Sequence, residues 1–249
     1  MSRIGRFDTD SEALRARITA HERAGSADFD GWVASQLDVH TGQRVLDLGA
    51  GTGKQSVPAA HAVGPEGHVV AVDASAESLA ALADRAREEG VDGRVDTEQT
   101  TFDALRVTGP FDRVVSCYAL YYAEDPKAVL ERIHAVLAPG AVVFVCGPSR
   151  HNNEELRELH RTLGGAAAAA MTPAARFMEE LAPATMAKLF AACERVEFEN
   201  PLEFWSRDEL LTYWRNYNLY DPALDSAFER SAPDRFRTVK RAIGLRATR

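Results

Sequence analysis

Apolar and polar positions along this chain follow two periods, one typical of strands and one typical of helices. Short, nearly continuous apolar runs predict strands at 44–48, 68–73, 94–98, 111–117 and 141–146. Between them, apolar residues recur every three or four positions, which predicts helices over about 54–63, from Ser75 to Gly90, and from Asp125-Pro126 to Pro139-Gly140. Buried strands that alternate with helices predict a parallel sheet covered on both faces.

The flanking segments depart from this alternation. Residues 11–38 predict two helices separated by Gly25-Ser26. Further helices are expected at 154–163 and 184–193, and strands at 195–205 and 236–247 with a helical insert from Asp208 to Tyr220. The fold class expected is therefore α/β, doubly wound and Rossmann-like. It has a mostly parallel seven-stranded sheet with an antiparallel last strand, N-terminal helices and a helical lid insertion.

Composition narrows the classes of function. The chain is 45% apolar and 27% charged with a formal net charge of −8, so a basic nucleic-acid-binding face is not expected. Its three cysteines, Cys117, Cys146 and Cys193, form no C-x-x-C pair, which argues against a disulfide framework or a zinc site. Neither a signal peptide nor an apolar run of about 18 residues is present, so we expect a cytoplasmic protein with no membrane segment.

The most specific motif is a glycine-rich turn after the first strand. Asp47 ends the apolar run and is followed by Gly49, Gly51 and Gly53, which let a ligand approach the backbone closely. Asp73 ends the next strand, twenty residues after Gly53, where a carboxylate holds a ribose hydroxyl pair. The turn therefore predicts a site for an adenosine-type ligand. Lys54 stands where the dinucleotide pattern G-x-G-x-x-G has its third glycine, which disfavours a nicotinamide oxidoreductase.

Residues 44–149 resemble the class I S-adenosylmethionine-dependent methyltransferases. The resemblance rests on Asp47 to Gly53, on Ala71-Val72-Asp73-Ala74-Ser75, and on three further segments in the same order, 101–105, 111–122 and 136–141. These segments are similar to the small-molecule branch typified by the ubiquinone and menaquinone biosynthesis methyltransferases. The resemblance implies S-adenosylmethionine as cofactor and S-adenosylhomocysteine as product.

The same resemblance implies a set of cofactor-binding residues. Asp73 would bind both ribose hydroxyls, Asp47 would help to position the methionine end, and Phe102, Asp103 and Ala104 would line the adenine. Cys117 would lie near the methionine moiety, although a small buried side chain explains it equally well. The full set is Asp47, Gly49, Ala50, Gly51, Gly53, Asp73, Ala74, Phe102, Asp103 and Cys117.

Candidate residues on the substrate side follow the fourth and fifth strands. Tyr118, Tyr121 and Tyr122 begin a loop at a carboxyl strand end, where ligands bind in open α/β sheets. His151 follows the fifth strand, and a histidine there can act as a general base. Tyr121 and His151 are the candidate catalytic residues; packing of the tyrosines and a solvated loop histidine remain the alternatives. Ser116-Cys117-Tyr118 lacks the carboxylate of catechol-type enzymes, so we expect no divalent metal.

The expected function is methyl transfer from S-adenosylmethionine to an oxygen, nitrogen or carbon of a small metabolite. A non-methylating reaction such as cyclisation or decarboxylation, and a non-catalytic regulatory module, remain the alternatives. We expect four segments: a helical cap at 1–40, a cofactor-binding core at 41–149, a lid with the last core helix at 150–192, and C-terminal strands with a helical insert at 193–249. Monomer and homodimer both remain open, and no nucleic-acid or membrane partner is expected.

Overall fold

The chain is organised as two compact units. The computed structural model describes residue 19, residues 23–165 and residues 171–249, so most of the predicted helix beginning at Ser11 lies outside the described residues. The first unit, here called the sheet unit, comprises Phe29–Pro148, Pro173–Phe198 and Ile243–Arg249. The second, here called the helical unit, comprises Ser149–Thr172, Glu199–Ala242 and the described residues before Phe29.

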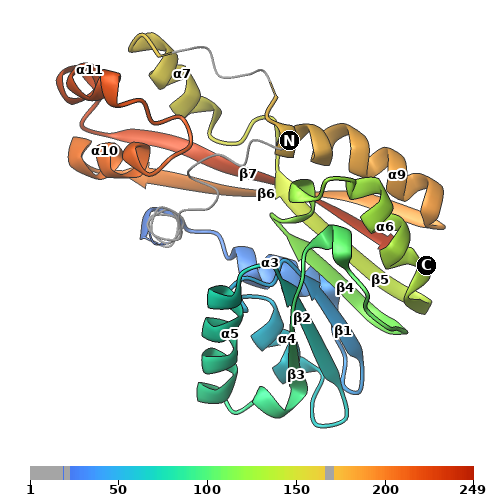
Figure 1. The fold of residues 1–249 in the computed structure, drawn as a ribbon. Helices are drawn as coiled ribbons and strands as arrows, with labels where there is room; N and C mark the ends of the chain where they lie inside the picture. Colours follow the sequence, from blue (N-terminus) through green and yellow to red (C-terminus); the bar gives the residue numbers. More distant parts are fainter. Residues whose placement is uncertain (1–18, 20–22, 166–170) are drawn as a thin grey trace. The chain divides into compact units, whose positions relative to one another are not determined.

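One seven-stranded sheet carries the fold, in the order β3-β2-β1-β4-β5-β7-β6 (Figure 1). Its strands are β1 Arg44–Leu48, β2 His68–Asp73, β3 Val95–Gln99, β4 Phe111–Cys117, β5 Leu137–Pro148, β6 Ala192–Phe204 and β7 Phe236–Thr248. The first five strands pair in parallel. Backbone hydrogen bonds from Arg249 to Ala141 and from Ser149 to Arg241 set β7 antiparallel to β5. The predicted mostly parallel sheet with an antiparallel last strand is confirmed.

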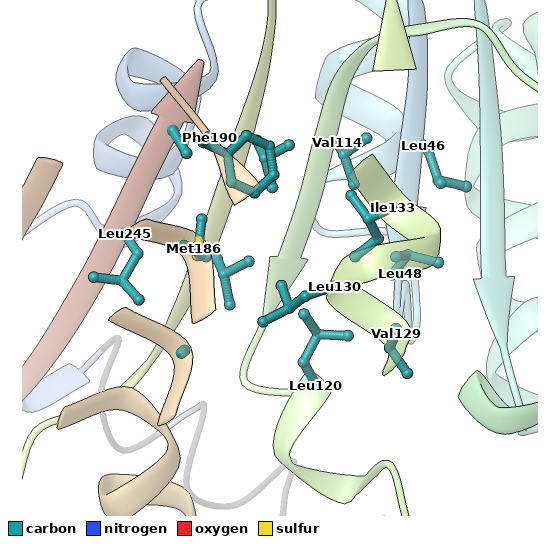
Figure 2. Close-up of a cluster of buried hydrophobic side chains, with 14 of the residues drawn as sticks. Leu46, Leu48, Val114, Leu120, Val129, Leu130, Ile133, Met186, Phe190 and Leu245 are labelled. Atoms are coloured by element: carbon teal, nitrogen blue, oxygen red, sulfur yellow. The ribbon is translucent and has the colours of Figure 1, made fainter. Parts of the chain in front are cut away.

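Successive strand residues pack on opposite faces of the sheet. Leu46 and Leu48 of β1 belong to the core formed with α6 and α9, whereas Val45 belongs to the core formed with α3 and α4. Figure 2 shows Val129, Leu130 and Ile133 of α6 packed beside Leu46, Leu48 and Val114, with Met186, Phe190 and Leu245 in the same cluster. Because both faces are covered, most positions of β1, β2 and β4 are buried.

Local capping signals mark the start of two of the helices that follow the parallel strands. The helices are α3 Phe29–Leu37, α4 Ser56–Ala62, α5 Ala76–Glu88, α6 Pro126–Ala135, α7 Glu154–Thr162, α8 Pro173–Arg176, α9 Ala182–Leu189, α10 Arg207–Arg215 and α11 Asp225–Ser231. Ser75 accepts a hydrogen bond from the Ser78 amide at the start of α5, and Asp125 caps α6 ahead of Pro126. No helix among the described residues is long and apolar enough to cross a bilayer.

Three predicted boundaries were wrong. Helix α6 ends at Ala135, and the strand expected at 141–146 already begins at Leu137, because Leu137 pairs with Phe111 of β4. The insert expected at 208–220 ends its first helix at Arg215 and adds α11 after Asp221-Pro222. Pairing between strands thus overrode the helical period that continued through Val136 and Leu137.

The helix expected at 184–193 was misplaced in both directions. Helical structure starts at Pro173 and continues through one π-helical turn, Phe177–Leu181, to Leu189, while Cys193 belongs to β6. Pro183 lacks an amide hydrogen and its ring clashes with the carbonyl four residues earlier in an α-helix. The wider turn, closed by the Ala182 amide on the Phe177 carbonyl, accommodates the proline without ending the helix.

The helical unit has its own apolar core. Trp214 of α10 is fully buried, stacks on Phe228 of α11 at 4.2 Å between ring centroids and meets the Tyr220 ring edge-on at 5.0 Å. Leu156 of α7 and Leu202 of β6 belong to the same cluster. A buried aromatic of this size makes the largest single contribution to such a small core.

Strand β1 buries one carboxylate within the sheet unit. The Asp47 side chain is 2% exposed, and its Oδ2 accepts a hydrogen bond of 2.6 Å from the Ser56 hydroxyl at the start of α4. Burial raises the pKa of Asp47 to about 7, and the nearby charge of Asp73 acts in the same direction. Below about pH 7, the Asp47 side chain of the folded protein is therefore mainly the protonated acid.

We predict that Asp47 makes the protein less stable as the pH rises from about 4 to about 7. The raised pKa means that its stabilising protonation is complete below the ordinary value of 3.8 and is lost as the pH passes the folded value. Relative to wild type, Asp47→Asn should gain roughly 2–3 kcal/mol in unfolding free energy between pH 5 and pH 8. Urea unfolding at both pH values measures this. Asp84→Asn, at an exposed carboxylate that pairs with Arg87, is the control, and a gain no larger than that of the control would contradict the prediction.

We also predict that Trp214→Ala destabilises the protein by about 3–5 kcal/mol, because it removes a large buried ring and leaves a cavity. Trp205 is 62% exposed with the Arg235 guanidinium over its ring, so Trp205→Ala is a matched control expected to cost less than about 1 kcal/mol. Denaturant unfolding followed by far-ultraviolet circular dichroism gives both values. A loss of unfolding free energy for Trp214→Ala as small as that expected for the control would show that the Trp214 ring does not stabilise the core.

Candidate functional site

The glycine turn after β1 joins β2, α5 and the loop after β4. Gly49, Gly51 and Gly53 all have left-handed φ angles of 77°, 53° and 82°. A Cβ on Gly49 would lie 2.2 Å from the Ala119 Cβ, and one on Gly53 would lie 2.7 Å from the Leu82 Cγ. A Cβ on Gly51 would meet no atom within 4 Å. Gly49 and Gly53 are therefore needed for close packing against Ala119 and Leu82, whereas the space in front of Gly51 is open.

Asp73 faces this turn from the end of β2. Its Oδ2 accepts a hydrogen bond of 2.8 Å from the Gly51 amide, and its Oδ1 accepts one of 2.9 Å from the Ser75 amide. The Gly49 and Ala50 amides bond the Val72 carbonyl, which fixes the turn against the same strand. A carboxylate held in this way keeps further lone pairs on both oxygens. The side chain is thus oriented and still able to accept two hydroxyl groups.

Phe102 and Asp103 lie in a short 3-10 turn, Phe102–Ala104, capped by the Thr101 hydroxyl. The Phe102 Cζ would lie 3.4 Å from a Cβ on Gly49, so the ring reaches the glycine turn. The Asp103 carboxylate accepts hydrogen bonds from the Glu124 and Asp125 amides at 3.2 and 3.4 Å. These bonds tie the turn to the start of α6 and leave lone pairs on the carboxylate.

The end of β4 carries the cysteine and tyrosine candidates. Cys117 is paired in register with Cys146, and a hydrogen bond between the two thiols, together with burial, raises the pKa of Cys117. Tyr118 has a left-handed φ of 56°, which is rare for an aromatic residue and typical of functional turns. Its ring lies 5.8 Å from that of Phe29 on the α3 face of the sheet.

Tyr121 and Tyr122 lie on the other face of the sheet from Tyr118. Their ring centroids are 4.6 Å apart, and the Tyr121 ring lies 6.3 Å from that of Phe177 in the π-helical turn. A Cβ on Gly147 would lie 3.3 Å from the Tyr121 ring and 2.9 Å from the Met178 side chain. The three tyrosines are therefore divided between the α3 face and the α6 face.

His151 belongs to the helical unit, in the turn before α7. The side chain is exposed, and its Nδ1 lies 3.1 Å from the Glu154 Oε2. Its carbonyl accepts from the Arg241 guanidinium, which also contacts Glu155 and Glu199 at 3.0 Å. Asn153 gives α7 no side-chain cap, because its Oδ1 accepts a hydrogen bond from the Thr238 hydroxyl while its Nδ2 donates to the Tyr213 hydroxyl. The turn is thus held by β7, and the histidine ring projects from it.

Sequence reasoning missed two contributors to the glycine turn. Ala119, two residues past β4, packs on Gly49, and Asp30 of α3 accepts a hydrogen bond of 3.0 Å from the Gln55 side chain. Ala119 lies within the segment 111–122 but has no predicted role there, Asp30 lies outside every motif, and folding of the chain brings both residues to this region. Within the described residues, no three His, Cys, Asp or Glu side chains form a group that could hold a metal ion.

Comparison with known proteins identifies the family. A family model described as "Methyltransferase domain" matches residues 39–202, more than half of the chain. The ubiquinone/menaquinone biosynthesis C-methyltransferase UbiE of Shewanella sp. (strain ANA-3) is 31% identical over 120 residues, 48% of this chain and 48% of that protein. The match therefore spans about half the length of this curated relative.

Solved structures agree in fold. The YcgJ protein from Bacillus subtilis superposes with a TM-score of 0.58 at 17% identity, covering 88% of this chain and 97% of that chain. The [4+2]-cyclase SpnF gives a TM-score of 0.54 at 21% identity, covering 88% and 79%. The chain belongs to the methyltransferase domain family, and it is similar to the class I S-adenosylmethionine-dependent methyltransferases, the UbiE proteins among them.

Proposed function

We propose that this protein transfers the methyl group of S-adenosylmethionine to an oxygen, nitrogen or carbon atom of a small metabolite. The observation that carries the proposal is the oriented carboxylate of Asp73, held by the Gly51 and Ser75 amides beside a glycine with open space in front of it. A carboxylate in this position matches the vicinal hydroxyls of a ribose.

The residues of the glycine turn and its neighbours fit such a cofactor. Asp73 would hold the ribose, while Gly49, Ala50, Gly51 and Gly53 would allow its close approach. Phe102, Asp103 and Ala104 would lie along the adenine, Ala74 would follow Asp73 beside the cofactor, and Asp47 and Cys117 would lie toward the methionine end. The proposal is supported by the way these residues converge from β1, β2, β4 and the turn after β3.

The cofactor supplies an electrophilic sulfonium methyl group, so the protein has little covalent chemistry to perform. The work left to this chain is to position an acceptor, exclude water and, where the acceptor needs it, remove a proton. We propose that Tyr118 and Tyr122 contact the acceptor. Tyr121 is proposed to orient it with its hydroxyl, and His151 to accept its proton.

Two other functions are possible on this fold, and an experiment can distinguish each from methyl transfer. The structural neighbour SpnF is a [4+2]-cyclase, so a non-methylating reaction such as cyclisation is the second candidate, and a regulatory module that binds the cofactor without turnover is the third. Methyl transfer releases one S-adenosylhomocysteine per product formed, a cyclase releases none, and a regulatory module forms no product. Mass spectrometry of product and S-adenosylhomocysteine with candidate acceptors therefore tests the proposal.

We predict that Asp73→Ala weakens S-adenosylmethionine binding about 5- to 150-fold, which corresponds to roughly 1–3 kcal/mol for unpaired ribose hydroxyls. Titration calorimetry measures the affinity. Asp84→Asn is the control, because Asp84 is exposed on α5, where it pairs with Arg87. Undiminished binding in Asp73→Ala, with the variant folded by circular dichroism, would refute the ribose assignment.

We predict that His151→Ala lowers kcat by about 10²–10⁴-fold while cofactor affinity stays nearly unchanged, because a proton acceptor acts on the chemical step. His40→Ala is the matched control, since His40 is exposed and pairs with Asp38 far in sequence from the proposed site. Turnover is followed by S-adenosylhomocysteine release. Wild-type rates in His151→Ala would mean that the enzyme acts by positioning alone.

A further inference from the structure

Helix α3 is held firmly on the sheet unit at both ends. At its C-terminal end the Arg113 Nε donates to the Leu37 and Asp38 carbonyls at 2.7 and 3.0 Å. The Arg246 Nε donates to the Gln36 carbonyl at 2.9 Å. At its N-terminal end the Phe29 ring meets Phe198 at 5.3 Å. The side chains of the first turn are therefore placed by the fold.

Asp30, in that first turn, reaches across to the residues that follow the glycine turn. Its Oδ1 accepts a hydrogen bond of 3.0 Å from the Gln55 amide group, and its Oδ2 lies 4.0 Å from the Lys54 Nζ. The separation of the two charges is too long for a hydrogen bond. Both side chains keep substantial exposure, 46% for Asp30 and 37% for Lys54. An anion and a cation thus stand side by side, partly open to a ligand.

The position of this pair relative to the other cofactor residues is informative. Lys54 follows directly after Gly53, and Phe29 beside Asp30 packs on Tyr118 beside Cys117. Phe102, in the turn proposed for the adenine, packs on the opposite face of the sheet. The pair therefore lies at the side of the glycine turn away from the proposed adenine segment, toward the end of β4.

The chemistry of the pair matches one end of the cofactor. The methionine tail of S-adenosylmethionine carries an ammonium and a carboxylate on the same carbon, so it is recognised best by an anion and a cation placed together. The pKa of Cys117 is raised first by the hydrogen bond with Cys146 and by burial. The negative charges of Asp47 and Asp30 raise it further. That agrees with a negative field where a cationic tail would lie.

We propose that Asp30 and Lys54 together hold the amino-acid tail of S-adenosylmethionine, Asp30 accepting from its ammonium and Lys54 donating to its carboxylate. This inference rests on the proposed function, since it assigns one end of the same cofactor. Gln55 is a positioning residue, because its hydrogen bond orients the Asp30 carboxylate. The alternative is an ordinary surface ion pair, which would contribute little to protein stability and nothing to cofactor binding.

Titration calorimetry on the full chain with four ligands distinguishes a cofactor-binding pair from a surface ion pair. S-adenosylmethionine and S-adenosylhomocysteine carry both tail charges, decarboxylated S-adenosylmethionine carries only the ammonium, and 5′-methylthioadenosine carries neither. Asp30→Asn should weaken the first three by about tenfold and leave 5′-methylthioadenosine within about twofold. Lys54→Gln should weaken S-adenosylmethionine and S-adenosylhomocysteine about 5- to 10-fold, and neither of the ligands that lack the carboxylate.

Matched controls come from the same helix and the same residue type. Asp38→Asn, at the other end of α3, and Lys127→Gln, on the exposed face of α6, should leave all four affinities unchanged. Equal losses for all four ligands, or no loss for S-adenosylmethionine, would overturn the role of Asp30 and Lys54 alone. Failure of the wild-type chain to bind any of the four would overturn the proposed cofactor, and this assignment with it.

Discussion

The hydrogen bond from the Gly51 amide to the Asp73 carboxylate is the interaction on which the proposed site depends. It joins the turn after β1 to the end of β2, and it exists only because Gly51 adopts a left-handed φ of 53° and turns its amide toward the carboxylate. Gly49 and Gly53 allow this geometry by letting Ala119 and Leu82 approach the backbone. The same bond orients an acceptor pair toward the open space beside Gly51.

The sheet beneath this turn is a consequence of burial on both faces. Leu46 and Leu48 pack toward α6 and α9, and Val45 toward α3 and α4, so β1 is fixed between two cores and its carboxyl end is rigid. Asp47 of the same strand is buried, and its carboxylate accepts a hydrogen bond from the Ser56 hydroxyl. A carboxylate retained at that position, at a cost in stability above neutral pH, is the pattern expected where electrostatics serve a ligand.

Local signals predicted the parts that depend on neighbouring residues in sequence. The five parallel strands, the Ser75 and Asp125 caps and the glycine turn with Asp73 all follow from spacing that a short window contains. The misses had two causes: Leu137 pairs with Phe111, which is distant in sequence, and a π-helical turn accommodates Pro183 without ending the helix. Asp30 carries no motif, and only the packing of α3 brings it to Gln55.

A crystal structure of the chain with S-adenosylhomocysteine tests the central claim most directly. We expect both ribose hydroxyls to lie within about 3 Å of the Asp73 carboxylate oxygens, with the hydrogen bond from the Gly51 amide to the same side chain still present. Well-ordered ligand density with the ribose away from Asp73, or with the Gly51 bond broken to admit it, would contradict the account.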